Sequence, residues 1–242
     1  MVVFIAFDFD RTLADYSKSH GRAFLQGIPE IYKRCIVNWM EIETTGLTDM
    51  QIITSFLHNR GMSYHEIFPK LPHCMTRMHE IFEENLQTHP IELLDGVEET
   101  LEKLTNQGVL LGLATGNLED IAWLKTENAG IRHYFSVGGF GSEAFTRTGV
   151  VRSSVEKAKK VLGLTDEDCF FHVGDTPSDM ISALEAKVFP IGVTTGSSDK
   201  QALRDAGAFA VIEDLRELPE FFDSPTFDQS IRTVSQLRCR TQ

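Results

Sequence analysis

The chain has 242 residues, of which 42% are hydrophobic and 24% charged, a composition typical of a globular protein that buries a full core. Its 35 acidic and 23 basic residues give a formal net charge of -12, which repels nucleic acid and anionic membranes and argues against both as partners. An anionic small molecule is not excluded, because a bound divalent cation or a local basic residue reverses the field inside a pocket.

The cysteines and the N-terminal segment bear on the cellular compartment of the protein. The four cysteines lie far apart in the sequence and form no Cys-x-x-Cys pair, which favours a reducing environment over a disulfide framework. The apolar run at 2–7 is interrupted at once by Asp8 and Asp10, so it is too short for a signal peptide or a membrane span. We therefore expect a soluble, cytoplasmic protein.

Short apolar runs predict strands at 2–7, 109–114, 135–137, 169–173, 188–193 and 209–212. Runs rich in Val, Ile and Phe without clean alternation suit strands that are buried on both faces. Helical spacing occurs between most of these runs, at 96–107, 118–130, 153–162 and 177–186. Alternating strands and helices predict an α/β fold with a Rossmann-like, doubly wound parallel sheet.

Residues 15–91 interrupt this alternation. They contain no convincing strand and show helical spacing at 30–43, 48–59 and 74–87. A segment of this length is rarely a structureless loop. We therefore predict a helical cap domain at 15–91, inserted into a Rossmann-like catalytic core formed by 1–14 and 92–225, and a polar C-terminal tail at 226–242.

Polar motifs follow three of the predicted strands. Their residues are Asp8, Asp10, Thr115, Gly116, Asn117, Asp175 and Asp179. In an open parallel sheet the carboxyl ends of neighbouring strands converge on one crevice. Carboxylates that meet there raise one another's pKa unless a cation compensates them, and oxygen ligands suit Mg²⁺. Such a site holds a phosphate between metal, hydroxyl and cation, and a carboxylate in line with phosphorus acts as a covalent nucleophile.

The motifs Asp8-x-Asp10-x-Thr12, Thr115-Gly116-Asn117 and Gly174-Asp175-x-x-x-Asp179 resemble, in this order, those of the haloacid dehalogenase (HAD) superfamily. The resemblance covers nearly the whole chain. The stretch from 108–117 to 138–141 is similar to the phosphoglycolate phosphatase-like branch, whose helical C1-type cap follows the first strand. The resemblance implies an Mg²⁺-dependent phosphatase that acts on a small phosphorylated metabolite, with phosphoglycolate the best single candidate.

The resemblance also implies the catalytic roles. Asp8 would attack phosphorus and carry the phosphoryl group as an aspartyl-phosphate. Asp10 would protonate the leaving oxygen and then deprotonate the hydrolytic water. Thr115 would donate to the phosphoryl oxygens and, with Gly116 and Asn117, form the substrate-binding loop.

The implied metal ligands come from two of the motifs. Asp8 would bind Mg²⁺ through its carboxylate, Asp10 through its backbone carbonyl and Asp175 through its carboxylate. Asp179 belongs to the same metal site, where it is expected to orient the ligands rather than to bind directly.

A basic residue balances the phosphate charge in this superfamily, often a Lys before a Pro, and this chain has no Lys-Pro pair. We take Arg152, at the start of the predicted helix 153–162, as the catalytic and phosphate-binding cation. Lys157, about one turn further along, is the second candidate. Lys125, on the helix after Thr115, is expected to be a solvated side chain.

The insertion offers weaker signals. Residues 46–49 resemble a segment that related phosphatases direct at the active site, and a turn with a helix cap at Thr48 is an equal alternative. His20 and Arg22 are candidate substrate contacts, although the solvated state is usual for a lone His or Arg. The histidines of the insertion do not show the spacing of a zinc site.

Two other functions remain open at this point. One is a sugar phosphomutase of the β-phosphoglucomutase type, and the other is a non-catalytic phosphate-binding or regulatory protein. An Asp at position 10 resembles the phosphatases and mutases, whereas dehalogenases of the superfamily carry other residues there. The presence of Asp8, Asp10 and Asp175 favours an enzyme.

Overall fold

The computed structural model describes residues 1–33, 38–41 and 44–224, so the predicted tail at 226–242 lies outside the described residues. Within them, six strands form one parallel sheet in the order β3-β2-β1-β4-β5-β6. The strands are β1 (Val3–Phe7), β2 (Leu110–Thr115), β3 (Phe135–Phe140), β4 (Cys169–Gly174), β5 (Phe189–Val193) and β6 (Ala210–Ile212). The predicted doubly wound α/β class is confirmed.

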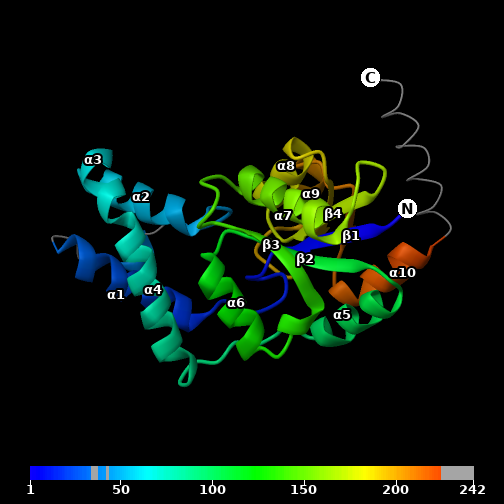
Figure 1. Ribbon diagram of the computed structural model, residues 1–242, viewed down its shortest axis with the longest axis horizontal. Coiled ribbons are helices and arrows are strands. Elements are labelled where there is room, and N and C mark those ends of the chain that lie inside the picture. Colours follow the sequence, from blue (N-terminus) through cyan, green and yellow to red (C-terminus); the bar gives the residue numbers. More distant parts are fainter. Residues whose placement is uncertain (34–37, 42–43, 225–242) are drawn as a thin grey trace.

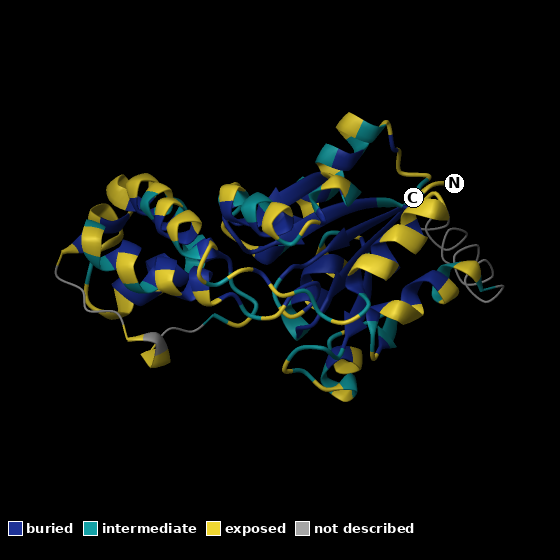
Figure 2. Ribbon diagram, turned by 90° about the horizontal axis from the view of Figure 1, so that it is seen from below, coloured by how far each residue is buried: buried dark blue, intermediate teal, exposed yellow. Residues whose placement is uncertain are grey.

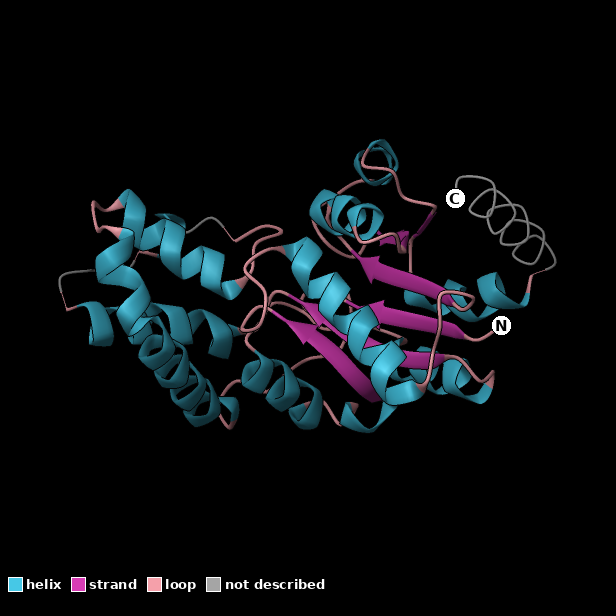
Figure 3. Ribbon diagram, turned by 45° about the horizontal axis from the view of Figure 1, so that its top comes forward, coloured by secondary structure: helices cyan, strands magenta, loops and turns pink. Residues whose placement is uncertain are grey.

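Helices cover both faces of the sheet because its central strands are apolar on both sides. Phe4 and Ala6 of β1 belong to one hydrophobic cluster, and Ile5 and Phe7 belong to the other. The first face is covered by α7 (Arg147–Leu162) and α8 (Pro177–Glu185), and the second by α5 (Val97–Asn106) and α10 (Leu218–Asp223). Figure 3 shows the sheet between these helical layers.

Two further helices and several short turns complete the core. Helix α6 (Glu119–Asn128) follows β2, and α9 (Lys200–Asp205) lies beside α8. The core also contains the 3₁₀ helices η3 (Arg132–Tyr134) and η4 (Leu215–Glu217), whereas η1 (Trp39–Glu41) and η2 (Phe68–Lys70) belong to the insertion.

The insertion between β1 and α5 is helical. It contains α1 (Lys18–Tyr32), α2 (Asp49–Asn59), α3 (Tyr64–Ile67) and α4 (Leu71–Leu86). Phe24 and Ile28 of α1 and Met78 and Phe82 of α4 are buried in one cluster, and α1 packs along α4. Figures 1 and 2 show these helices gathered beyond one end of the sheet, and Figure 3 shows the carboxyl ends of the strands pointing toward them.

The chain leaves the core and returns to it at neighbouring points. The amide of Asp15 donates to the carbonyl of Glu92 at 2.9 Å, and the amide of Leu94 donates to Leu13 at 3.0 Å. Ala14 also forms an antiparallel bridge with Leu93. The two linkers are therefore paired side by side, and the domain limits at 14/15 and 91/92 stay our proposal.

The helix boundaries differ from the predictions in two places. The first inserted helix is α1 at Lys18–Tyr32, not 30–43, and residues 34–37 and 42–43 of that range lie outside the described residues. Ser17 caps α1 by accepting from the amide of His20. Gly21, Gly27 and Pro29 lie inside this helix, where such residues are unfavourable. Helix α7 begins at Arg147, six residues before the predicted start, because Thr146 caps it.

Strand β3 extends to Phe140, beyond the predicted end at 137, and passes directly under α7. A Cβ atom added to Gly139 would lie 2.0 Å from the carbonyl oxygen of Val150 and 2.7 Å from the amide of Ser154. Both atoms belong to the backbone of α7, so neither moves aside without shifting the helix. A side chain at Gly139 is therefore incompatible with the observed helix position.

We predict that Gly139→Ala destabilises the protein by about 3 kcal/mol, at the upper end of ordinary overpacking. Ser136→Ala, at the exposed position of the same strand, should change stability by less than ~0.5 kcal/mol. Urea unfolding followed by circular dichroism measures both. Equal stability of the two variants would contradict the close contact of β3 with α7.

Candidate active site

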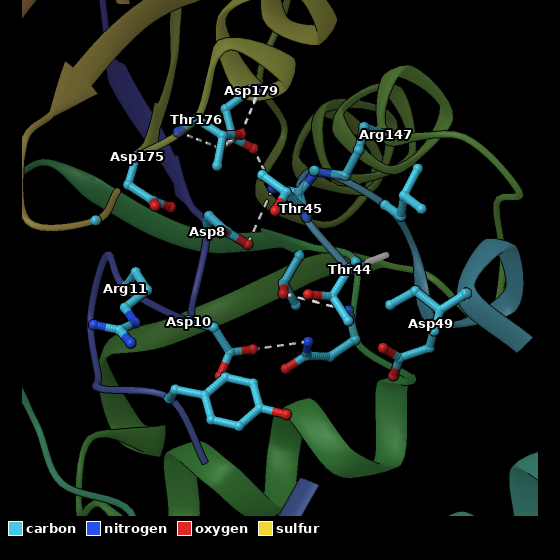
Figure 4. Close-up of a pocket in the computed structure, with 18 of the residues that line it drawn as sticks. Asp8, Asp10, Arg11, Thr44, Thr45, Asp49, Arg147, Asp175, Thr176 and Asp179 are labelled. Carbon is cyan, nitrogen blue, oxygen red and sulfur yellow. Dashed lines mark hydrogen bonds and ion pairs between the residues drawn. The ribbon is translucent and has the colours of Figure 1, made fainter. Parts of the chain in front are cut away.

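Three strand ends deliver the motif residues to one cavity. Asp8 directly follows β1, Thr115 ends β2, and Asp175 directly follows β4. The amide of Asp8 donates to the carbonyl of Val173 at 2.8 Å, so the β1 and β4 ends are held in register. The cavity has a volume of about 480 Å³ and is lined by the motif residues and by parts of the insertion. Figure 4 shows the labelled side chains around it.

Asp8, Asp175 and Asp179 form a buried carboxylate cluster, in which one oxygen of each lies within 4.8 Å of the others. Asp179 sits in the first turn of α8, where Thr176 is the N-cap. The hydroxyl of Thr176 donates to Asp179 Oδ2 at 2.6 Å, and the Thr176 amide donates to the same oxygen at 3.1 Å. The sequence Thr-Pro-x-Asp thus fixes Asp179 by a capping box.

The remaining oxygen of Asp179 is also occupied. Arg147 Nη2 donates to Asp179 Oδ1, and His172 Nε2 lies 3.3 Å from the same atom. Burial by itself raises the pKa of Asp179, but the charges of Arg147 and His172 outweigh it and hold that pKa far below its usual range. Asp179 is therefore an ionised residue that orients its neighbours, and its oxygens are already bonded to protein donors.

Arg147 is the cation at the centre of the cluster. Its Nη2 also lies 3.1 Å from Asp8 Oδ1, and the residue is 7% exposed. It is the first residue of α7, because the hydroxyl of Thr146 accepts from the amide of Gly149 at 3.1 Å. Although burial alone lowers the pKa of Arg147, the carboxylates of Asp179 and Asp8 raise it, so the guanidinium stays charged.

Arg147 and His172 together do not balance the charge of three carboxylates. Burial raises the pKa of Asp8, with Asp179 and Asp10 adding to the rise and Arg147 opposing it. Burial also raises the pKa of Asp175 to about 8, with further contributions from Asp8 and Asp179. These hard oxygen donors fit a divalent cation such as Mg²⁺, which supplies the missing positive charge. Asp8 and Asp175 are the carboxylates that would hold it.

Asp10 lies in a separate charged group. Lys125 Nζ donates to both carboxylate oxygens of Asp10 at 2.7 Å, and Asn117 Nδ2 donates to Oδ2 at 2.9 Å. Burial favours the neutral acid, but the charge and hydrogen bonds of Lys125 outweigh it and lower the pKa of Asp10. The carboxylate of Asp10 is thus directed to Lys125, which leaves only its backbone carbonyl for a metal.

The expectation of a solvated Lys125 is wrong. Its side chain has 0% exposure, and Nζ also donates to Asn117 Oδ1 at 2.7 Å and to His20 Nδ1 at 3.2 Å. A lysine so deeply buried is stable only where acceptors surround its ammonium. Its position in the last turn of α6 gave no sequence signal, because solvated lysines are common on such helices.

The expectation for Arg152 and Lys157 is also not supported by their positions. Arg152 Nη2 donates to the carbonyl of Glu185 at 2.9 Å on the surface, and Lys157 Nζ donates to Gly138 at 2.9 Å. Neither lines the cavity that the described residues form. The early start of α7 explains the difference, because it places Arg147 at the mouth of the helix and Arg152 in its second turn.

The loop after β2 contacts both the substrate cavity and the insertion. Thr115, Gly116 and Asn117 line the cavity together. A Cβ atom on Gly116 would lie 2.5 Å from the carbonyl of Leu47, so glycine permits the inserted segment to approach this loop. The Gly116 carbonyl accepts from the Asp49 amide at 2.8 Å.

Both alternatives for residues 46–49 are realised. Thr48 forms a capping box with Gln51 at the start of α2, and its hydroxyl donates to Phe145 at 3.0 Å. Gly46, Leu47 and Asp49 also line the cavity, so one segment both caps helix α2 and forms part of the cavity wall.

His20 and Arg22 differ in their positions. His20 is 4% exposed and lines the cavity, and its Nε2 lies 3.0 Å from Asp49 Oδ2. The solvated alternative is therefore wrong for His20. Arg22 donates to Asn85 Oδ1 at 3.0 Å on the exposed surface, which agrees with that alternative.

Among the residues that the structure describes, no helix combines the length and the apolar composition that crossing a membrane requires.

Comparison with known proteins gives a family match over residues 5–193, to the model described as haloacid dehalogenase-like hydrolase. A "probable phosphoglycolate phosphatase" of Pseudomonas putida is 29% identical over 54% of this chain and 52% of its own length. A phosphoglycolate phosphatase of Agrobacterium fabrum is 32% identical over 43% of this chain and 44% of its own length. The matched region thus spans about half the length of these curated relatives.

Solved structures share the fold. A hydrolase from Pseudomonas syringae has a TM-score of 0.68 at 21% identity, covering 92% of this chain and 98% of its own. CbbY from Rhodobacter sphaeroides, solved in complex with phosphate, has a TM-score of 0.69 at 19% identity, covering 90% of this chain and 96% of its own.

The raised pKa of Asp175 makes the stability of the metal-free protein depend on pH. Because its pKa is raised from 3.8 to about 8, the folded state holds a proton that the unfolded state releases. The carboxyl therefore makes the metal-free protein less stable as the pH rises through this range. Above pH 8, Asp175→Asn should raise the Tm of the protein in a chelating buffer.

Added Mg²⁺ should raise the Tm of the wild type and have a much smaller effect on the variant, because a ligand that binds the folded state stabilises it. Differential scanning fluorimetry measures both effects. A chelated variant that melts below the wild type, or an undiminished Mg²⁺ shift, would show that Asp175 is not a metal ligand short of a cation.

Proposed function

Because this chain belongs to the haloacid dehalogenase-like hydrolase family, we propose that it hydrolyses small phosphomonoesters with Mg²⁺ through an aspartyl-phosphate on Asp8. The observation that carries this proposal is the buried cluster of Asp8, Asp175 and Asp179. Its negative charge exceeds the positive charge beside it, which suits a divalent cation and, with that cation, a phosphate. The two relatives named as phosphoglycolate phosphatases support the same class of reaction.

Asp8 is the proposed nucleophile. Its carboxylate lies at the end of the central strand, 7% exposed and beside Arg147. Attack of an Asp8 carboxylate oxygen on phosphorus forms the oxygen–phosphorus bond of an acyl phosphate while the bond from phosphorus to the leaving oxygen breaks. Mg²⁺, when bound by Asp8, the Asp10 carbonyl and Asp175, supplies positive charge to the phosphoryl oxygens. Asp179 holds the surrounding side chains in place.

Asp10 is the proposed acid–base residue. The leaving oxygen needs a proton, and a water molecule must lose one in the second step. Lys125 holds Asp10 ionised, which suits its action as the base. The first step requires the protonated form of Asp10, whose proton goes to the leaving oxygen, and the hydrolytic water returns a proton to Asp10 in the second step.

Arg147 and Thr115 are the proposed phosphate contacts. Arg147 reaches Asp8 at 3.1 Å, so its charge lies where the transferring phosphoryl group gains negative charge. Thr115 lines the same cavity at the end of β2. Gly116 and Asn117 complete the loop, with the Asn117 side chain committed to Asp10 and Lys125.

The proposed partner is a small phosphorylated metabolite, since a cavity of about 480 Å³ accommodates a compact ester. Phosphoglycolate is the first compound to test, because it is named for two relatives. We place the activity in the cytoplasm. The free, buried thiol of Cys74 supports a reducing compartment.

The first prediction concerns the nucleophile. Phosphate release from a panel of phosphorylated metabolites should depend on Mg²⁺, and Asp8→Asn should reduce kcat by roughly four orders of magnitude or more, as expected for loss of a nucleophile. Circular dichroism checks that the variant is folded. Retained turnover in a folded Asp8→Asn variant would refute the covalent mechanism, and product analysis would reveal an isomerised sugar phosphate if the protein were a mutase.

The second prediction compares two arginines on one helix. Arg147→Gln should lower kcat/KM by about 10²- to 10³-fold, the usual cost of losing a group that stabilises transition-state charge. Arg152→Gln should leave kcat/KM within about twofold, because the surface contact of Arg152 is worth little. Arg147→Lys keeps the charge and serves as the folding control. A larger loss in the Arg152 variant would restore the role expected from the sequence.

A further inference from the structure

The insertion contributes its own wall to the cavity. This wall is opposite the strand ends and contains Tyr16, His20, Phe24, Leu47, Asp49 and Ile52. Phe24, Asp49 and Ile52 are buried. Since the phosphoryl group must lie against Asp8, the leaving group of the ester extends toward this wall. The side chains of the wall therefore select the leaving group.

His20 contributes no charge to this wall. Lys125 Nζ lies 3.2 Å from His20 Nδ1, and an ammonium has only donors, so Nδ1 accepts. The ring proton is then on Nε2, which donates to Asp49 Oδ2 at 3.0 Å. A chain of hydrogen bonds thus runs from Asp10 through Lys125 and a neutral His20 to Asp49.

Asp49 is the carboxylate of this wall. Its Oδ2 accepts from His20 and from the amide of Leu118 at 2.9 Å. Both of these hydrogen bonds go to one oxygen, and Asp49 lines the cavity. Its Oδ1 is therefore open to a donor from a ligand.

Among the described residues, the cations around this wall already have carboxylate partners. Lys125, behind His20, is bonded to both oxygens of Asp10. Arg147 is bonded to Asp8 and Asp179. Arg11, at the rim, is paired with Asp15 at 3.3 Å and lies across the cavity from Asp49 in Figure 4. A substrate carboxylate near Asp49 would meet a like charge at low dielectric.

Resting on the proposed phosphatase activity, we propose that Asp49 determines specificity by accepting a hydrogen bond from an uncharged hydroxyl or an ammonium group of the leaving alcohol. The preferred substrates are then phosphate esters of polyols or amino alcohols, and a carboxylate ester such as phosphoglycolate is disfavoured. Phe24 and Ile52 provide an apolar surface for the carbon chain of such an alcohol.

A matched series of two-carbon esters tests this inference. Hydroxyethyl phosphate, phosphoethanolamine, ethyl phosphate and phosphoglycolate differ only at the end of the leaving group, which is a hydroxyl, an ammonium, a methyl or a carboxylate. With Mg²⁺ and wild-type protein, kcat/KM for the hydroxyl or the ammonium ester should exceed that for phosphoglycolate by about tenfold or more. The better of the two identifies the donor.

The variant Asp49→Asn makes the test specific to this residue. His20 and Leu118 both donate to one oxygen of Asp49, so the amide oxygen of Asn takes that place and its NH₂ group faces the cavity. The variant should lose about tenfold in kcat/KM for the donor-bearing ester and gain for phosphoglycolate, which inverts or levels the preference. Asp120→Asn, at an exposed site near the start of helix α6, is the matched control and should leave the preference unchanged.

The outcomes separate this inference from the proposed function. If the wild type hydrolyses none of the esters and no compound of the metabolite panel, the phosphatase proposal fails. If the wild type hydrolyses the series and prefers phosphoglycolate, or if Asp49→Asn leaves the order of preference unchanged in a folded protein, only the role of Asp49 is overturned. Binding of the same esters to Asp8→Asn, measured by calorimetry, should follow the same order as kcat/KM, and a reversed order there would also overturn it.

Discussion

Three carboxylates buried within 4.8 Å of one another cannot all be ionised without positive charge close by. Arg147 provides one such charge, and the consequences run through the core. Helix α7 must begin beside the end of β1 to place Arg147 in the cluster. Residue 139 of β3 must lack a side chain so that this helix can lie against the sheet. Asp179, which receives most of the compensation, is fixed by Thr176 and His172. The negative charge of Asp8 and Asp175 is not fully balanced, and a divalent cation that binds there would balance it and attract a phosphate.

A second charged group joins the core to the insertion. Asp10 is bonded to Lys125, which contacts His20 of α1, which in turn contacts Asp49 at the start of α2. The backbone of Asp49 also bonds to Gly116. The acid–base residue and the wall that faces the leaving group are therefore parts of one hydrogen-bonded network. A change in the position of the insertion would alter the surroundings of Asp10 as well as the shape of the cavity.

The sequence was sufficient for features that depend on local patterns. The buried strands, their order of appearance and the residues at their ends follow from short apolar runs that stop at Asp8, Thr115 and Asp175. The cations were missed, because their roles depend on where helices begin and which way they face. Gly149 lies in the first turn of α7 and is unfavourable in a helix, so the start of α7 and the role of Arg147 were missed, although Thr146 is a recognisable N-cap. Lys125 belongs to the site because α6 places its side chain against Asp10. No spacing in the sequence reveals this contact.

The central claim is that Asp8 accepts the phosphoryl group, and direct detection of that group tests it. Wild-type protein mixed with Mg²⁺ and its best ester, quenched in acid within one turnover and digested, should yield a peptide containing Asp8 that carries one phosphoryl group by mass spectrometry. The label should vanish after hydroxylamine treatment, which cleaves acyl phosphates. Phosphate release with no covalent label at any time point, or a label on a peptide without Asp8, would contradict the account.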